Sequence, residues 1–360
     1  MKSRARLSER VCPRWLAGLG LLCLVTALLS DPSAIRPAAA RGGPAALPPL
    51  TLQAIFGPKP TLAGLDPHKL ITIVATGDVI PGRTSNYLMV QSGDFVGPFK
   101  PTGTFLHDAD ITLINLESPL LDACQPTVYG MAFCGDPRFV RGLRYAGVDV
   151  ANLSNNHLGN YGWDGIYETE RHLADAGIAY CGMGTTAHLT VKGVRFAFLG
   201  YNGVGVDFDR ALIRREISRE HRAGYVVIVS FHWGKEYVRV PQTTLGIAND
   251  DPRAIGRLAV DSGADLVVGN HPHWVQGLEL YHGRLITYAH GNFIFDQNWS
   301  VETQQGVIGR YVFYQRHLAQ ARYFPVVIHN QLQPQWATAD VGRSMLTAMR
   351  QASEWLDRHR

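Results

Sequence analysis

The feature of this sequence that most constrains its fold is a repeated alternation of short apolar runs and helix-like stretches from residue 70 onward. The runs are rich in β-branched residues, and several are continuously hydrophobic, as expected for strands buried on both faces. They cover residues 71–75, 111–116, 148–153, 195–199, 226–231, 264–268 and 285–288. Helix-like stretches lie between them, at residues 137–145, 163–176 and 252–262. This alternation predicts an α/β fold.

The last part of the chain has a different pattern. Residues 309–315 and 321–329 look like successive strands with no helix between them, which predicts an antiparallel part. A final helical stretch covers residues 344–358. We therefore expect one α/β domain over residues 70–343, closed by a C-terminal helix in residues 344–360.

Polar residues follow six of the apolar runs. In α/β sheets, ligands bind outside the carboxyl ends of the strands, so these residues are expected at one edge of the sheet. Each cluster offers Asp, Glu, Asn or His, the donors of a mixed oxygen and imidazole metal site. Any one cluster alone fits an ordinary turn or helix cap. Because all six occur together, the sequence predicts a metal centre rather than six separate turns.

Charge and missing motifs exclude other classes of protein. The chain has 34 Lys and Arg residues and 30 Asp and Glu residues. Residues 1–40 hold six of the basic and two of the acidic residues, so the rest of the chain has equal numbers of basic and acidic residues. A neutral body gives no basis for nucleic acid as a partner, because that binding needs a basic surface. Neither a Gly-x-Ser-x-Gly elbow nor a phosphate-binding glycine loop is present.

The N-terminus has the order of an export signal. Basic residues 2–14 precede an apolar run at 15–29, and small residues follow at 38–40. The run is shorter than the roughly 20 residues that span a bilayer, so we expect residues 1–40 to be a signal peptide, with an uncleaved signal anchor as the alternative. Residues 41–69 are rich in Pro, Ala and Gly and are interpreted as a linker. The expected location is extracytoplasmic, either secreted or anchored to the membrane by the N-terminal segment.

Three cysteines lie beyond the leader. In an oxidising compartment Cys124 and Cys134 would close a short disulfide loop, and the alternative is two free thiols in a polar loop. Cys181 has no obvious partner and is expected to be a buried, small hydrophobic residue.

The polar clusters, in this order, resemble the capsule-synthesis CapA family, which is associated with poly-gamma-glutamate capsules. The resemblance covers about residues 70–330 and rests on GDVIPGR (77–83), NLE (115–117), NNH (155–157), HWGKEY (232–237), GNHPH (269–273) and GNF (291–293). That family in turn resembles calcineurin-like metallophosphoesterases. The fold that this implies is a four-layer sandwich, in which two β-sheets flanked by helices hold two metal ions at the strand ends.

The resemblance also implies roles for single residues. Asp78 would be the metal ligand from the first strand, and Glu117 would be the carboxylate that bridges two ions. His157 would contact the substrate or act as general acid. The remaining ligands would be Asn156, His232, His271 and His273.

Two positions depart from the phosphoesterase pattern. That pattern begins Asp-x-His, whereas Ile80 stands at the third position here, and Asn270 stands where the family often has another His. One metal position would keep only Asp78, Glu117 and His273. The other would have the full set of Glu117, Asn156, His232 and His271. We therefore expect one tightly bound divalent ion and a second, weaker one, with Mn, Fe or Zn as the candidate metals.

Two further residues have open interpretations. Arg83 would neutralise an anionic substrate by bidentate hydrogen bonding, or would be a surface residue at the start of a helix. His290 would be an additional ligand or a solvent-facing residue.

The function that the resemblance implies is metal-dependent, phosphoesterase-like hydrolysis of an anionic substrate or capsular polymer. The alternative is a non-catalytic, membrane-associated component of a capsular polymer assembly or export complex, with membrane subunits of capsule synthesis as partners.

Overall fold

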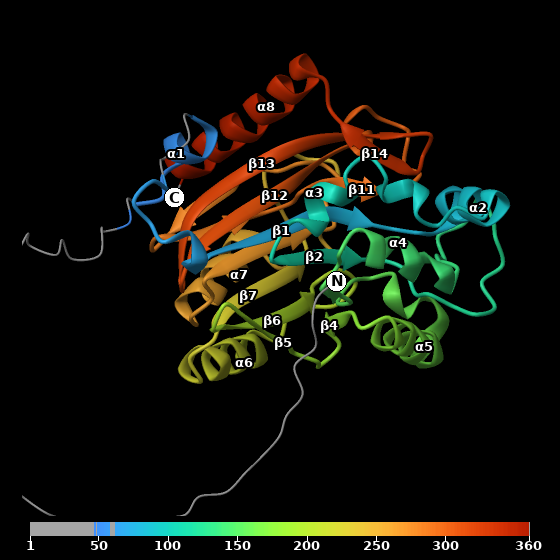
Figure 1. Cartoon of the computed structure of the whole chain (residues 1–360), viewed down its shortest axis with the longest axis horizontal. Coiled ribbons are helices and arrows are strands. Elements are labelled where there is room, and N and C mark those ends of the chain that lie inside the picture. The colour runs from blue at the N-terminus through green and yellow to red at the C-terminus, as the bar shows by residue number, and fades with distance from the viewer. Residues whose placement is uncertain (1–46, 48, 58–61, 360) are drawn as a thin grey trace, which may run out of the picture. The chain divides into compact units, whose positions relative to one another are not determined.

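The structure is a computed structural model that describes residues 47, 49–57 and 62–359. The predicted signal peptide or anchor, residues 1–40, and residues 41–46, 48 and 58–61 of the predicted linker lie outside the described residues. Among the described residues, no helix has both the length and the apolar character needed to cross a bilayer. The described strands form two sheets that lie one above the other (Figure 1).

The larger sheet has the strand order β14-β13-β12-β1-β2-β3-β4, and β11 also pairs with β1. Neighbouring strands from β1 to β4 are parallel, whereas β12, β13 and β14 are antiparallel to their neighbours. This confirms the predicted antiparallel part near the C-terminus. The strands are β1 (Leu70–Val79), β2 (Ile111–Leu116), β3 (Val150–Asn152), β4 (Ala179–Cys181), β11 (Asn292–Ile294), β12 (Gln305–Tyr314), β13 (His317–His329) and β14 (Gln333–Trp336).

The smaller sheet has the order β5-β6-β7-β8-β10-β9. Its four central strands are parallel, and the two outer strands, β5 and β9, are antiparallel to their neighbours. The strands are β5 (Ala187–Val191), β6 (Val194–Asn202), β7 (Val226–His232), β8 (Leu266–Asn270), β9 (Leu278–Tyr281) and β10 (Arg284–Thr287). The larger sheet is thus parallel from β1 to its β4 edge and antiparallel toward its β14 edge, whereas the smaller sheet has a parallel centre and an antiparallel strand at each edge.

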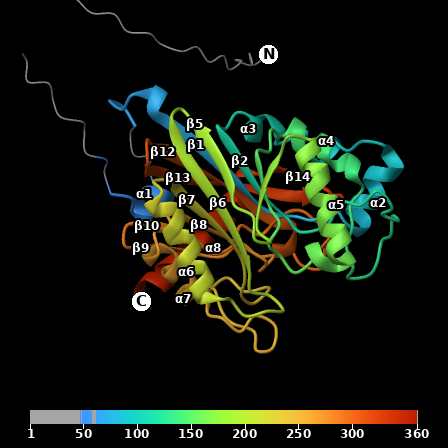
Figure 2. The same cartoon turned by 90° about the horizontal axis from the view of Figure 1, so that it is seen from below.

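Helices cover the outer faces of the two sheets. Over the larger sheet lie α2 (Arg83–Ser92), α3 (Gly103–His107), α4 (Val140–Tyr145) and α5 (Gly162–Asp175). Over the smaller sheet lie α6 (Arg210–Arg222), which Figure 2 shows beside β6 and β7, and α7 (Pro252–Asp261), which contacts β8 and β10. Helix α8 (Ala339–Arg358) packs against β9 and β13. Short 3-10 turns are η1 (Pro67–Lys69), η2 (Gly97–Phe99), η3 (Pro137–Phe139), η4 (Leu158–Tyr161) and η5 (Glu302–Gln304).

Successive side chains of a strand point to opposite faces of the sheet, so each strand contributes side chains to two layers of the core. On β1, Ile73 lies in the cluster between the two sheets, while Val74 packs toward the helices of the larger sheet. On β7, Ile228 belongs to the same inner cluster and Val229 packs toward α6 and α7. The result is helix, sheet, sheet, helix, which confirms the four-layer sandwich.

Part of the predicted linker is folded. Helix α1 (Leu52–Phe56) places Ile55 in the inner cluster, and the helix contacts α8 and β13. The Arg322 guanidinium donates hydrogen bonds to the carbonyls of Ile55 and Gly57, at 3.0 and 2.8 Å. The structure thus differs from the linker interpretation at these residues, because their apolar side chains find a surface on which to be buried.

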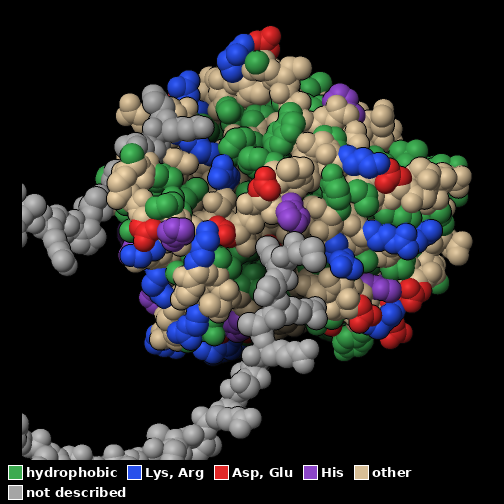
Figure 3. Space-filling model, viewed as in Figure 1, with side chains coloured by type: hydrophobic (Ala, Val, Ile, Leu, Met, Phe, Trp, Pro, Cys, Tyr) green, Lys and Arg blue, Asp and Glu red, His purple; other side chains and the backbone are tan. Residues whose placement is uncertain are grey.

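Cys124 and Cys134 form the predicted disulfide, with an S–S distance of 2.02 Å. A closed loop of this size stabilises a fold by about 3 kcal/mol, because it restricts the unfolded chain. Cys181 is buried and free, also as expected. Acidic and basic side chains are both spread across the face seen in Figure 3, in keeping with the balanced charge of the body.

Candidate metal centre

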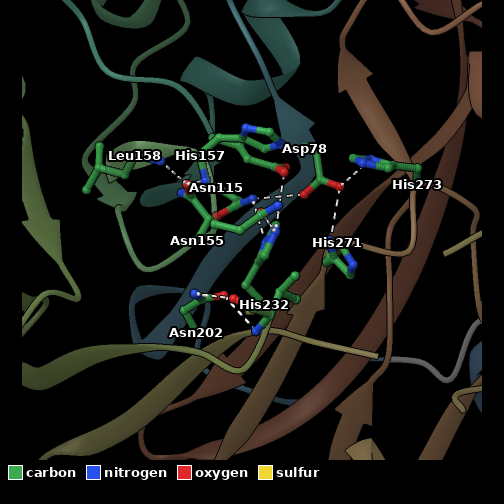
Figure 4. Close-up of polar contacts among 12 residues, drawn as sticks. Asp78, Asn115, Asn155, His157, Leu158, Asn202, His232, His271 and His273 are labelled. Atoms are coloured by element: carbon green, nitrogen blue, oxygen red, sulfur yellow. Dashed lines mark hydrogen bonds and ion pairs between the residues drawn. The ribbon is translucent and has the colours of Figure 1, made fainter. Parts of the chain in front are cut away.

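The predicted site residues come from both sheets and meet where the parallel strands end. Asp78 lies in β1, and Glu117 follows β2 directly. Asn156 and His157 lie between β3 and η4, His232 ends β7, and His271 and His273 follow β8. Figure 4 shows Asp78 with Asn155 and His157 on one side and with His271 and His273 on the other. The structure thus brings these predicted residues together across the two sheets.

Asp78 is buried and fixed by three contacts. Asn115 Nδ2 donates to Asp78 Oδ1 at 2.9 Å, and the backbone N–H of His271 donates to Oδ2 at 3.3 Å. Nδ1 of His273 is also 3.3 Å from Oδ2. Burial alone would raise the pKa of Asp78, but its hydrogen bond with His273 and the positive charge of that ring hold the pKa below the usual value. Asp78 is therefore a carboxylate at neutral pH.

The side-chain oxygens of Glu117, like the ring nitrogens of His271, are buried without a hydrogen-bond partner among the described residues. Glu117 is fully buried. The nearest base is Nε2 of His232, 3.3 Å from Oε1. Burial, and then the negative charge of Asp78, raise the pKa of Glu117 well above its ordinary value. Buried charges in proteins are normally paired or coordinate metals, so this carboxylate fits a cation.

Two of the three histidines are neutral bases. Burial lowers the pKa of His232 to about 3, and burial together with the neighbouring imidazoles lowers that of His271 well below its usual value. Both ring nitrogens of His271 are buried and have no hydrogen-bond partner. Nε2 of His232 lies 2.8 Å from Asn156 Oδ1. A neutral imidazole is the form that binds a metal ion, so both rings are in a state suited to that role.

His273 is held differently. Burial would lower its pKa, but the hydrogen bond to Asp78 and the charge of Glu117 raise it to about 9. Nδ1 also lies 2.9 Å from Asn292 Oδ1, so this nitrogen is a donor to two oxygens and Nε2 is left for other partners. His271 and His273 have φ angles of +96° and +56°. Such angles are uncommon for residues other than glycine and gather at functional sites.

The acidic and histidine side chains of this site form two groups that could hold a metal. One group is Asp78, Glu117 and His232, and the other is Glu117, His271 and His273. Within each group, one donor atom per residue lies within 4.8 Å of the others. Both groups contain Glu117, which fits the implied bridging role. The two groups divide the histidines differently from the sets that the resemblance implies. In the structure His232 groups with Asp78, and His273 groups with His271, because Nδ1 of His273 already donates a hydrogen bond to Asp78.

His157 lies beside the metal groups on a fixed turn. Oδ1 of Asn155 accepts hydrogen bonds from the backbone N–H groups of His157 and Leu158, at 3.2 and 2.8 Å. The imidazole packs on the ring of Phe133, and Nδ1 lies 3.1 Å from Oδ1 of Asn160. Nδ1 is therefore the donor in the neutral ring, and Nε2 is the nitrogen able to accept a proton. Burial lowers the pKa of His157 to about 4.

Arg83 already has a partner within the chain. Its Nε and Nη2 donate to Oδ1 of Asp296, at 3.1 and 2.5 Å, and its guanidinium lies over the rings of Phe133 and Phe295. Nη1 donates to the carbonyl of Gly130 at 3.3 Å. The face of Arg83 expected to bind an anion thus holds Asp296 instead, and its role toward a substrate stays a prediction.

His290 does not face solvent, and it belongs to neither of the two groups that could hold a metal. It is fully buried, with Nδ1 3.2 Å from the Thr76 carbonyl and Nε2 2.8 Å from the Tyr311 hydroxyl. These contacts join β1 to β12 behind the site. Asn115 and Asn292, to which we assign no role from the sequence, instead position Asp78 and His273. Their presence in the same polar clusters is the signal that could have identified them.

A cavity of 620 Å³ opens beside Asn156. Side chains of Tyr201, Asn202 and Phe208 are among those that line it. Ligand pockets in proteins are commonly about 300–1,000 Å³. The metal groups therefore lie next to a space large enough for part of a substrate.

Comparison with known proteins gives a family match over residues 72–297, to the bacterial capsule synthesis protein family PGA_cap. The chain is 29% identical over 264 residues to the capsule biosynthesis protein CapA of Bacillus anthracis. This match covers 65% of this chain and 62% of that protein. It is 30% identical over 211 residues to the PGA biosynthesis protein CapA of Bacillus subtilis (strain 168), with 53% of each protein covered. The chain thus spans between half and two thirds of the length of these relatives.

One solved structure similar to this chain is that of a hypothetical protein from Thermus thermophilus. It has a TM-score of 0.44 and 17% sequence identity, and the match covers 71% of this chain and 98% of that one.

Proposed function

Because this chain belongs to the bacterial capsule synthesis protein family PGA_cap, part of the metallophosphoesterase-like superfamily, we propose that it hydrolyses a phosphoester-like or anionic polymer substrate with bound metal ions. The biosynthesis of a poly-gamma-glutamate capsule is the process to which the names of its relatives point. The observation that best supports metal-dependent hydrolysis is the environment of Glu117. Its two oxygens are buried without a hydrogen-bond partner, and it is shared by two groups able to hold a metal.

The residues of the site fit two divalent ions. Those that would hold the ions are Asp78, Glu117, Asn156, His232, His271 and His273. Divalent ions at such a site polarise the scissile bond and lower the pKa of water. Mn, Fe or Zn would suit this mixture of carboxylates, imidazoles and an amide, with one ion bound tightly and the second more weakly. His157 would exchange a proton with the substrate at Nε2, and the cavity beside Asn156 would hold the rest of the substrate.

The activity is tested with the purified full-length chain. Metal content would be measured after dialysis, and hydrolysis would be followed on aryl phosphomonoesters, phosphodiesters and poly-gamma-glutamate. We expect hydrolysis of at least one substrate, loss of that activity in a chelator, and recovery on adding back Mn²⁺, Fe²⁺ or Zn²⁺. A chain that binds none of these ions after reconstitution would overturn the proposal.

The proposed place of action is outside the cytoplasm, on the basis of the basic, apolar and small-residue order of residues 1–40. A periplasmic or extracellular reporter fused to the C-terminus should be active, and one that works only in the cytoplasm should be silent. The mass of the N-terminal peptide would distinguish cleavage after Ala40 from an intact anchor. The opposite pattern of reporter activity would contradict export.

A second candidate function is a binding platform in a capsule assembly complex. Exposed apolar side chains surround the site, and such patches mark contact surfaces. They are Met131, Val206, Ile247 and Trp299, each more than half exposed. Met131 contacts Arg83, Val206 lines the cavity, and Trp299 packs on Tyr237 beside His273. The partners would be membrane subunits of capsule synthesis.

A further inference from the structure

One carboxylate beside the histidine pair belongs to neither implied ligand set. Oε1 of Glu236 lies 3.9 Å from Nε2 of His271 and 4.0 Å from Nε2 of His273. The Glu236 side chain is 40% exposed, so it approaches the pair from solvent, whereas Glu117 lies on the buried side. We propose that Glu236 is a ligand of the ion held by Glu117, His271 and His273, an assignment that rests on the proposed metal-dependent function.

The distances suit a shared cation better than hydrogen bonds. A nitrogen to oxygen distance of 3.9–4.0 Å is too long for a hydrogen bond. Carboxylate oxygens and imidazole nitrogens lie about 2.0–2.2 Å from a bound zinc ion, so two donors of one ion stand about 3–4 Å apart. Nε2 of His271 has no other partner, and His273 uses its other nitrogen, Nδ1, on Asp78 and Asn292. Oε1 of Glu236 thus lies within 4.0 Å of the Nε2 atoms of both histidines.

The backbone fixes Glu236 to the turn that carries the two histidines. Tyr237 N–H donates to the carbonyl of Pro272 at 3.0 Å, and Pro272 is the residue between His271 and His273. Lys235 N–H donates to the carbonyl of Gln242 at 2.8 Å. Gly234 has a φ of +80°, which glycine adopts without strain and which turns the chain sharply after β7. The position of Glu236 is therefore set by the same turn as the imidazoles.

Glu236 also supplies a donor that the first strand does not. Ile80 is buried with Phe133 and Phe295 in a small apolar cluster, so β1 contributes only Asp78 to the centre. With Glu236 as a ligand, the ion of the His271 and His273 group has two carboxylates and two imidazoles, a set suited to Mn, Fe or Zn. Three carboxylates against two divalent ions leave a net charge of +1, which still attracts an anionic substrate.

The test is Mn²⁺ binding to the full-length chain carrying Glu236→Gln, measured by calorimetry and by metal content after dialysis. Glutamine keeps the size of the side chain and removes its charge, so folding is expected to be unchanged. We expect affinity for one ion to fall at least about tenfold, since even changes behind the ligands cost 10–100-fold. Affinity for the other ion should remain as in the wild type.

The matched control is Glu302→Gln. Glu302 is a partly exposed glutamate in η5 that faces Arg239 at 3.5 Å and no site histidine, so its change should leave both affinities alone. Wild-type stoichiometry and affinities in Glu236→Gln would overturn the assignment of Glu236 while leaving the metal-dependent function intact. A wild-type chain that binds no Mn²⁺, Fe²⁺ or Zn²⁺ would instead overturn the proposed function and this assignment together.

Discussion

Replacing Glu117 with glutamine should abolish tight binding of both metal ions while leaving the metal-free protein at least as stable as the metal-free wild type. The first effect follows because Glu117 belongs to both groups able to hold a metal. The second follows because both of its oxygens are buried without a hydrogen-bond partner, and an unpaired buried charge destabilises a fold. The pKa of Glu117 is raised, so this cost is absent at low pH and present at pH 7.

Thermal unfolding with and without metal measures both effects. A ligand at about 1,000 times its dissociation constant stabilises the native state by about 4 kcal/mol. The wild type should therefore lose several degrees of melting temperature in a chelator, and Glu117→Gln should melt at the same temperature with or without metal. Unchanged metal content in Glu117→Gln would contradict the shared role.

Glu279→Gln is the control for this experiment. Glu279 is also buried, but it accepts hydrogen bonds from Arg257 and from the hydroxyl of Tyr288, at 2.6 and 2.7 Å. Its replacement removes a satisfied charge and should destabilise the protein, by about 3–5 kcal/mol for a broken buried pair. Metal content should be unchanged, because Glu279 lies on β9 and in neither metal group. Comparing the stabilities of the two variants thus distinguishes removal of a buried charge that has no partner from removal of a buried charge that is paired.

The central strands could be predicted from the sequence because each is a continuous apolar run. Strands β1, β2 and β7 lie where those runs are, and β2 matches to the residue. Strands β4 and β11 have only three residues each, and both are defined by pairing with strands elsewhere in the chain. The three residues of β3 lie inside the predicted apolar run at 148–153. Strands β4 and β11 lie in no such run and are too short to show a period, so they emerge only from the assembled sheet.

The gathering of the candidate ligands at one place could be predicted from the sequence, and their contacts could not. The ligand candidates follow strand ends, so topology alone gathers them at one edge. The partner of Arg83 is Asp296, and His273 is held by Asp78, which lies almost 200 residues earlier in the chain. Glu236 becomes significant only through its distances to His271 and His273. Such contacts depend on how the two sheets face each other, and this arrangement cannot be predicted from the local sequence.

Replacing His157 with asparagine should remove most hydrolytic activity and leave metal content unchanged. His157 lies beside the metal groups but belongs to neither, and its Nε2 is free because Nδ1 faces Asn160. A positioned acid or base contributes about 10²–10⁴-fold to a rate, so turnover should fall by that range. Asn156→Ala should instead lower metal content, because Asn156 Oδ1 lies 2.8 Å from Nε2 of His232 and is proposed to hold the same ion. Metal analysis and turnover on one phosphoester substrate would be measured for both variants.

His317→Asn is the control for the histidine change, because His317 is exposed and pairs with Tyr314, at the opposite end of β1 from Asp78. It should match the wild type in both measurements. The same variants separate an enzyme from a binding platform when each is the only copy in a capsule-producing cell. If hydrolysis makes or releases the polymer, His157→Asn should reduce polymer levels as strongly as it reduces turnover. A platform needs only the folded surface around Met131, Ile247 and Trp299, so wild-type polymer levels with His157→Asn would reject the hydrolytic role and favour the platform.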